Sequence, residues 1–169
     1  PEDATPIKGE YIYPVFVMEQ YSALTLGNHD VAPASSSVAY LHGKMLPRFK
    51  GRYVTSNTIW RETGDFFGVP YKVQTHGRTG LTALMFGFIY CFQEANQLVD
   101  IVDPVVVAKS QWFQQVLRNS SADFVVITAH IAPQLPQKET LLGIFKSIRA
   151  LRPRIPIVFL VGHSHVLDY

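Results

Sequence analysis

The chain has 169 residues, of which 47% are hydrophobic and 17% are charged, and this composition is typical of a globular domain rather than a disordered segment. Its formal charge of +2 is small and its Lys and Arg residues are scattered, so nucleic acid is not expected as a partner. No apolar run reaches the roughly 18 residues that a membrane-spanning helix requires, and the single cysteine excludes an internal disulfide.

The first half of the chain predicts four strands and one helix. The predicted strands cover residues 21–26, 53–57, 71–75 and 81–89. The last two of these strands flank a hairpin turn at 76–80. Three consecutive serines at 35–37 offer N-caps for a helix that should run to about Met45.

The second half alternates helices with strands. Asp103 followed by Pro104 is typical of a helix start, and this helix should run to about Leu117. Apolar residues at 141, 145, 148 and 151 predict a second amphipathic helix that Pro153 terminates. Buried strands are predicted at 124–129 and 157–161. This alternation indicates an α/β layered fold, and we expect a single domain over residues 1–169.

Polar side chains directly follow three of the predicted strands. Asn28 and His29 follow the first strand, His130 follows the strand that ends at residue 129, and His163 and His165 follow the last strand. In α/β sheets, functional groups gather beyond the carboxyl ends of strands, so we expect these loops to converge. Imidazole nitrogens and an amide oxygen together suit transition-metal dications, so the pattern predicts a mixed metal site.

Several other residues receive a structural interpretation or only a weak functional one. His42 and His76 do not follow buried strands and are interpreted as structural, and Cys91 is interpreted as a small buried hydrophobe. Gly64 and Asp65 are interpreted as a turn. The triplet at residues 119–121, Asn-Ser-Ser, matches the N-glycosylation acceptor pattern and fits a secretory or vacuolar protein, although such triplets are common by chance.

Three motifs, in this order, resemble those of the calcineurin-like (binuclear) metallophosphoesterases. The sequence ALTLGNHD at 23–30 resembles the G-N-H-D/E motif, especially as the 5'-nucleotidase branch has it. The strand before His130 stands where the family has a strand followed by a histidine, and VGHSH at 161–165 resembles the G-H-x-H motif. The resemblance implies a layered α/β/β/α sandwich and a metal-dependent phosphoester hydrolase that acts on phosphomonoesters, with nucleotides among the candidate substrates.

The resemblance also implies roles for individual residues and two divalent ions, of Mn, Zn or Fe. The implied metal ligands are Asn28, His130, His163 and His165. The first three would bind one ion and the last would bind the other. His29 would face the substrate and protonate the leaving oxygen or stabilise phosphoryl charge, and Asp30 would orient His29. The two ions would activate a water for in-line attack, and no other cofactor is implied.

The family's first two motifs, D-x-H and G-D-x-x-D/N, have no counterpart in residues 1–20. They supply the aspartate that bridges both metals, and without it two dications would repel each other with no anionic ligand between them. We therefore expect this chain to hold an incomplete domain, the C-terminal part of the catalytic domain, and to be inactive in isolation. The rest would come from an N-terminal segment of the same protein or from a larger assembly.

Two alternatives stay open. The absent aspartates favour a non-catalytic, phosphoesterase-like structural or interaction subunit, which intact upstream motifs would exclude. The second alternative is a generic α/β domain with incidental histidines, against which metal bound beside His163 would count.

Overall fold

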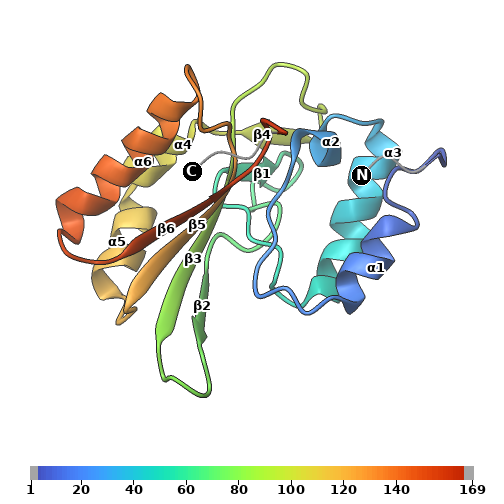
Figure 1. Cartoon of the computed structure of the whole chain (residues 1–169). Coiled ribbons are helices and arrows are strands. Elements are labelled where there is room, and N and C mark those ends of the chain that lie inside the picture. Colours follow the sequence, from blue (N-terminus) through green and yellow to red (C-terminus); the bar gives the residue numbers. More distant parts are fainter. Residues whose placement is uncertain (1–3, 166–169) are drawn as a thin grey trace.

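A sheet of four strands and a smaller sheet of two strands organise the computed structural model, which describes residues 4–165 (Figure 1). The larger sheet has the order β2-β3-β5-β6, and these strands are Lys72–Thr75, Thr82–Ile89, Phe124–His130 and Ile157–Val161. The pairs β3–β5 and β5–β6 are parallel, and the β2–β3 hairpin is antiparallel as predicted. The smaller sheet pairs β1 (Thr58–Trp60) with β4 (Val99–Ile101). The predicted α/β fold is therefore confirmed.

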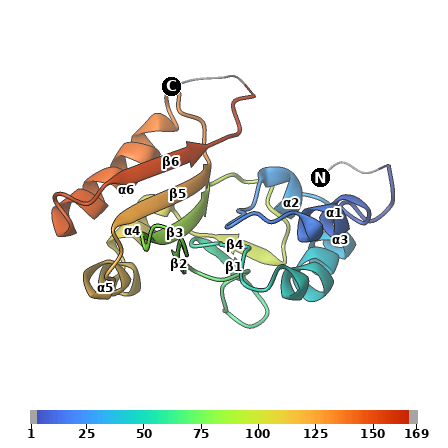
Figure 2. The ribbon, with the colours of Figure 1, turned by 60° about the horizontal axis from the view of Figure 1, so that its bottom comes forward.

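Three helices cover one face of the larger sheet (Figures 1 and 2). They are α4 (Pro104–Lys109), α5 (Gln111–Asn119) and α6 (Lys138–Leu151). Aromatic rings pack between the two layers, and the centroids of the fully buried Phe86 and Phe113 lie 4.3 Å apart. Parallel strands require crossover connections, and these helices provide them, so β3, β5 and β6 all end at the same edge of the sheet.

A second apolar core packs between the smaller sheet and the helices of the first half of the chain. These helices are α1 (Ile12–Met18), α2 (Asn28–Val31), α3 (Ser35–Tyr40), the π-helix η1 (Leu41–Met45) and the 3₁₀-helix η2 (Leu46–Phe49). The helix predicted near the serines thus exists, but its N-cap is Ala34 with no side-chain cap bond, so the predicted serine cap is wrong, and the helix continues beyond Met45. It ends after Phe49 because Lys50 and Gly51 adopt left-handed φ angles of 51° and 74°. Within residues 4–165, every helix is too short or too polar to cross a bilayer.

Two predicted strands of the first half are wrong. Residues 21–26 form no strand, because only Leu24 makes a bridge, to Tyr53. Residues 53–57 are deeply buried, but their backbone bonds in turn to Leu24, Val69 and Gly87, so no continuous ladder develops. The apolar, β-branched composition correctly predicted that residues 53–57 are buried, but not their succession of hydrogen-bond partners, whereas in residues 21–26 Leu26 alone is buried and Tyr21 is exposed.

Three predictions of the second half need correction. Asp103 caps its helix as predicted, since its carboxylate accepts from two backbone N–H groups, but the helix breaks at Ser110, where the backbone is extended. The strand β6 is an edge strand rather than a buried one, and Val158 and Leu160 are 44% and 57% exposed. Cys91 is exposed rather than buried.

The helix α6 exists as predicted, and Leu141, Ile148 and Leu151 pack on the core as expected, but Ile144 takes the place of Phe145 on the buried face. Ile144 and Ile148 are fully buried, whereas Phe145 is 37% exposed. The apolar spacing identified the helix, but the position of the sheet decides which apolar residues it covers.

Two buried polar side chains join the sheets. The Asn57 amide donates to the carbonyls of Ile89 and Val102, each at 2.8 Å, and its oxygen accepts from the Ile89 N–H at 3.0 Å. Next to it, the Ser56 hydroxyl accepts from the Gly87 N–H at 3.0 Å. The end of β3 is thereby fixed to the segment that leads into β1, and unsatisfied backbone groups are avoided in the core.

We expect Gly87→Ala to destabilise the chain by about 2 kcal/mol or more. A Cβ atom at this position would lie 2.1 Å from the Val54 carbonyl oxygen and 2.7 Å from Thr25 Oγ1, so the backbone would have to move. The control is Gly43→Ala, because a Cβ atom there has no neighbour within 4 Å. Urea unfolding of both variants measures the difference, and equal stabilities would contradict this account of the packing.

Candidate metal centre

Three of the predicted ligand atoms lie in contact at one end of the sheet. Asn28 Oδ1 is 2.9 Å from His130 Nε2, and His130 Nε2 is 3.2 Å from His163 Nδ1. These residues are far apart in the sequence, and the predicted convergence of the strand ends brings them together. Figure 1 shows their elements: α2, the end of β5 and the loop that follows β6.

The local backbone explains how each side chain reaches this point. His130 is the last residue of β5, and Gly27, just before α2, leaves room for its ring, because a Cβ at Gly27 would lie 3.3 Å from it. His163 and His165 follow β6 with positive φ angles of 86° and 57°. Such angles are uncommon for residues other than glycine, so this turn holds its imidazoles in an unfavourable backbone conformation.

Tyr90 supports the imidazole pair from the side. It follows β3, and its ring centroid lies 4.4 Å from that of His163 and 6.4 Å from that of His130. The two imidazole rings are 4.9 Å apart and nearly perpendicular. The aromatic contact limits the orientations that the His163 ring can adopt.

Tyr13, Gly27 and Tyr53 each donate a hydrogen bond to Asp30. Its Oδ1 accepts from the Tyr13 hydroxyl at 2.8 Å, and its Oδ2 accepts from the Gly27 N–H at 2.8 Å and from the Tyr53 hydroxyl at 3.3 Å. These bonds fix the carboxylate beside the short helix that carries Asn28 and His29. Burial, and then the negative charge of Asp30, raise the pKa of Tyr53 well above its ordinary value, so this phenol stays a donor.

The electrostatics of the cluster favour neutral imidazoles. Burial, followed by the imidazole of His163, lowers the pKa of His130 to about 4, although Asp30 opposes this effect. Burial, followed by His165 and His29, lowers the pKa of His163. A neutral imidazole has a free lone pair, so the environment keeps both rings in the form that binds metals.

The donor atoms fit a shared cation in their spacing but not in their charge. Ligands at about 2.1 Å from a metal are about 3.0 Å apart in octahedral geometry and about 3.4 Å apart in tetrahedral geometry. The observed separations of 2.9 Å and 3.2 Å match these values. All three donors are neutral, however, and within residues 4–165 no three His, Cys, Asp or Glu side chains form a metal-binding group.

The remaining predicted residues lie near this cluster. His29 and His165 are close enough for their charge to lower the pKa of His130. His42 instead stacks on Trp60 with a centroid separation of 4.0 Å, and His76 bonds to Thr79 within the hairpin turn. Sequence reasoning missed Tyr13, Tyr53 and Tyr90. The last of these stands after a predicted strand, as the histidines do, which is the signal that could have identified it.

Lowering the pH should destabilise the metal-free chain through His130. Its folded-state pKa of about 4 lies below the ordinary 6.5, so between these values the unfolded chain binds a proton that the folded chain does not. If unfolding bound one whole proton at His130, each pH unit would lower the unfolding free energy by about 1.4 kcal/mol. Solvent screening of this partly buried ring makes the actual effect smaller.

Urea unfolding in the presence of a chelator, between pH 4 and 7, measures this slope. The matched variant His130→Gln keeps an amide near the same place but does not titrate. We expect its stability to change less with pH, and an unchanged slope would show that other groups are responsible.

Residues 6–167 match the calcineurin-like phosphoesterase family, and the chain therefore belongs to this family. Members of the family generally bind divalent metals. Solved structures that are similar to the chain include a 5'-nucleotidase and an NAD nucleotidase. The crystal structure of 5'-nucleotidase from Candida albicans is similar with a TM-score of 0.83 and 26% identity, over 92% of this chain. The NAD nucleotidase of Haemophilus influenzae, with a TM-score of 0.65 and 18% identity, shares the fold.

Relatives by sequence are longer proteins. An uncharacterized protein of Schizosaccharomyces pombe is 31% identical over 99% of this chain, and a protein of Arthroderma benhamiae described as secreted is 29% identical over 99% of it. The chain spans 28% and 26% of the lengths of these two relatives and 29% of the Candida albicans structure.

Proposed function

We propose that the protein hydrolyses phosphomonoesters, with nucleotides as the first substrates to test, and that the cluster at the end of β5 and β6 is part of its metal centre. The supporting observation is the contact of Asn28 Oδ1, His130 Nε2 and His163 Nδ1 at 2.9 and 3.2 Å. Family membership and the likeness to the Candida albicans 5'-nucleotidase support the reaction class.

Each residue of the cluster has a defined part in this proposal. The metal ligands would be Asn28, His130, His163 and His165. Two divalent ions bound there would supply a nucleophilic water and neutralise charge on the phosphate. The ring of His29, which follows Asn28 on the short helix α2, would donate a proton to the leaving oxygen or stabilise phosphoryl charge. Asp30, fixed by Tyr13, Tyr53 and the Gly27 N–H, would hold this turn of helix in place.

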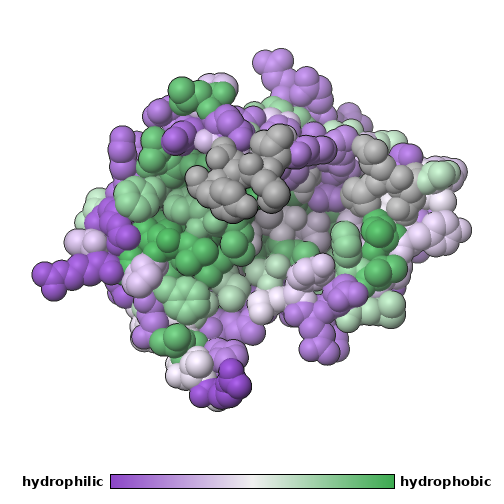
Figure 3. Space-filling model, in the orientation of Figure 1, coloured by the Kyte–Doolittle hydropathy of each residue, from purple (hydrophilic) through white to green (hydrophobic). Residues whose placement is uncertain are grey.

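The absence of an anionic ligand among the three contacting donors implies that carboxylates from elsewhere complete the centre. The surface beside the centre supports this view. Leu142, Phe145, Val158 and Leu160 are 36–57% exposed around β6, and Figure 3 shows an apolar patch over this region. A groove of about 610 Å³ runs between α6 and the edge of β6. β6 also has no strand on its outer side within residues 4–165.

We infer that another segment of the parent protein packs on this patch and brings acidic side chains to the imidazoles. An uncovered strand edge can accept a further strand, and burying the exposed leucine and valine side chains would stabilise that contact. A strand paired in parallel with β6 would end at the same edge as β5 and β6, next to His130 and His163. We also propose a secretory or vacuolar location, supported by the secreted relative.

In the full-length protein, Asn28→Ala should lower kcat/KM for an aryl phosphate by on the order of 100-fold or more, because a metal ligand is lost. The assay uses added Mn²⁺ or Zn²⁺ and a panel of nucleotides, with bound metal measured in parallel. His76→Ala, which lies in the β2–β3 turn, is the control and should leave both values unchanged. If the unmodified protein binds metal but cleaves no phosphoester, the non-catalytic scaffold becomes the better account.

Leu160→Asp tests the proposed covering of β6. Leu160 is 57% exposed in this chain, so the substitution should change the stability of the 169-residue chain little. In the full-length protein the same carboxylate would be buried against the covering segment, and we expect the unfolding temperature to fall by several degrees. Equal effects in the two proteins would contradict the inferred contact.

A further inference from the structure

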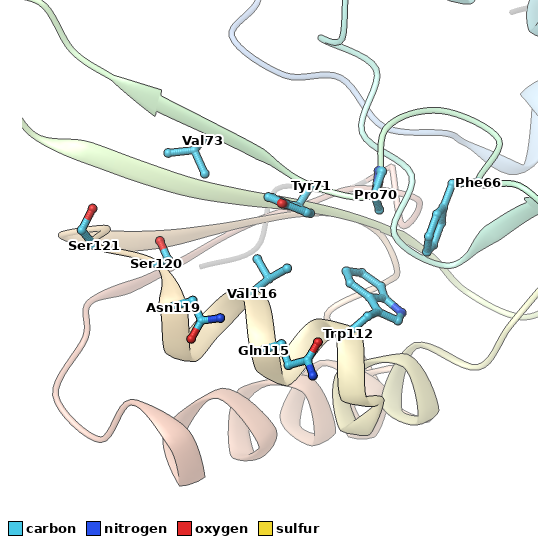
Figure 4. Close-up of a pocket in the computed structure, with 10 residues that line it drawn as sticks. All are labelled: Phe66, Pro70, Tyr71, Val73, Trp112, Gln115, Val116, Asn119, Ser120 and Ser121. Atoms are coloured by element: carbon cyan, nitrogen blue, oxygen red, sulfur yellow. The ribbon is translucent and has the colours of Figure 1, made fainter.

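A second hollow lies on the far side of α5 from α6, between that helix and the β2 strand with the loop that precedes it. It has a volume of about 630 Å³, and Figure 4 shows the side chains that line it. Its apolar surface includes Tyr71, Val73 and Trp112, and its polar surface includes the amides of Gln115 and Asn119. None of its lining residues is charged. We refer to it as the α5 groove.

The α5 groove does not belong to the proposed metal centre. Asn119 ends α5 and lies just before β5 starts at Phe124, whereas His130 is the last residue of that strand. The end of the groove formed by Asn119, Ser120 and Ser121 therefore lies at the opposite edge of the sheet from the imidazole cluster. The α5 groove and the proposed metal centre are therefore separate features of the molecule.

We propose that Asn119 is an N-glycosylation site and that the first sugars of its glycan lie in the α5 groove. Asn119, Ser120 and Ser121 form an acceptor triplet, and all three residues line the groove. Such triplets often occur by chance, but this one lies in the lining of a groove that also contains aromatic side chains. The proposal rests on the proposed secretory location and is independent of the metal centre.

The acceptor residues are available for modification. Asn119 and Ser121 are exposed, and the side chain of Asn119 makes no hydrogen bond to any residue within 4–165. The helix ends at Asn119, and Ser120 has an extended backbone, so the last two residues of the triplet lie outside the helix. In the modification, Asn119 Nδ2 forms a bond to C1 of N-acetylglucosamine. The bond from C1 to a lipid diphosphate breaks, the diphosphate leaves, and the amide loses one proton to a base of the host transferase.

The lining of the groove suits a sugar better than a charged or wholly apolar ligand. Tyr71 is 39% exposed and Val73 is 50% exposed, so apolar surface remains in contact with water. The apolar faces of sugar rings can cover such surface, while the nearby amides and hydroxyls can bond to sugar hydroxyls. The absence of charged side chains from the lining excludes an ionic anchor for a phosphate or a carboxylate.

Modification is tested by producing the full-length protein in a fungal secretory host and measuring its mass before and after treatment with an N-glycan amidase. A peptide that contains Asn119 should carry N-acetylglucosamine. Asn119→Gln and Ser121→Ala should abolish the modification, whereas Ser121→Thr, which keeps the acceptor pattern, should retain it. An unmodified Asn119 peptide would overturn the proposal, whether or not the protein is an active phosphatase.

The position of the glycan is tested by a double-mutant comparison. We expect Asn119→Gln to lower the unfolding temperature by a few degrees when Tyr71 is intact, because the sugars no longer cover the groove. In a Tyr71→Ser background the same loss of the glycan should have a smaller effect. Equal shifts in the two backgrounds would show that the glycan lies elsewhere and would overturn its assignment to the groove.

Discussion

The parallel pairing of β3, β5 and β6 is the constraint on which the site depends. Its register places Ile89 opposite His130, so the ends of β3 and β5 lie level, and Val161 pairs with Ala129 at the end of β6. A shift of one residue in the pairing of β5 would turn the His130 side chain to the other face of the sheet. The buried bonds of Asn57 and Ser56 to β3 maintain this arrangement from the side of the smaller sheet.

The sequence predicted the regular parts of this structure because periodicity and capping are local properties. The Asp103 cap, the β2–β3 hairpin, β5 and α6 follow from a few neighbouring residues each. The segments around Leu24 and Tyr53 were misassigned because their hydrogen bonds go to residues remote in the chain. The exposure of β6 could not be predicted either, because an apolar strand has the same sequence pattern whether or not another segment covers it.

The candidate site, like the fold, could be predicted from the sequence only in part. The contact between Asn28, His130 and His163 could be expected, because strand ends in an α/β sheet converge. The hydroxyls that fix Asp30 could not, since Tyr13 and Tyr53 reach it from two separate elements of the second core. No local pattern encodes such contacts, and aromatic residues are usually explained by burial alone.

The turn after β6 also bears on how this protein could evolve. His163 and His165 occupy backbone conformations that glycine adopts without strain, at φ angles of 86° and 57°. Selection for folding stability alone would favour their replacement, so in the proposed metal centre these imidazoles would be kept for their chemistry at the expense of stability. A lineage that no longer needed the metal would therefore be expected to lose these two histidines early, while the sheet beneath them persisted.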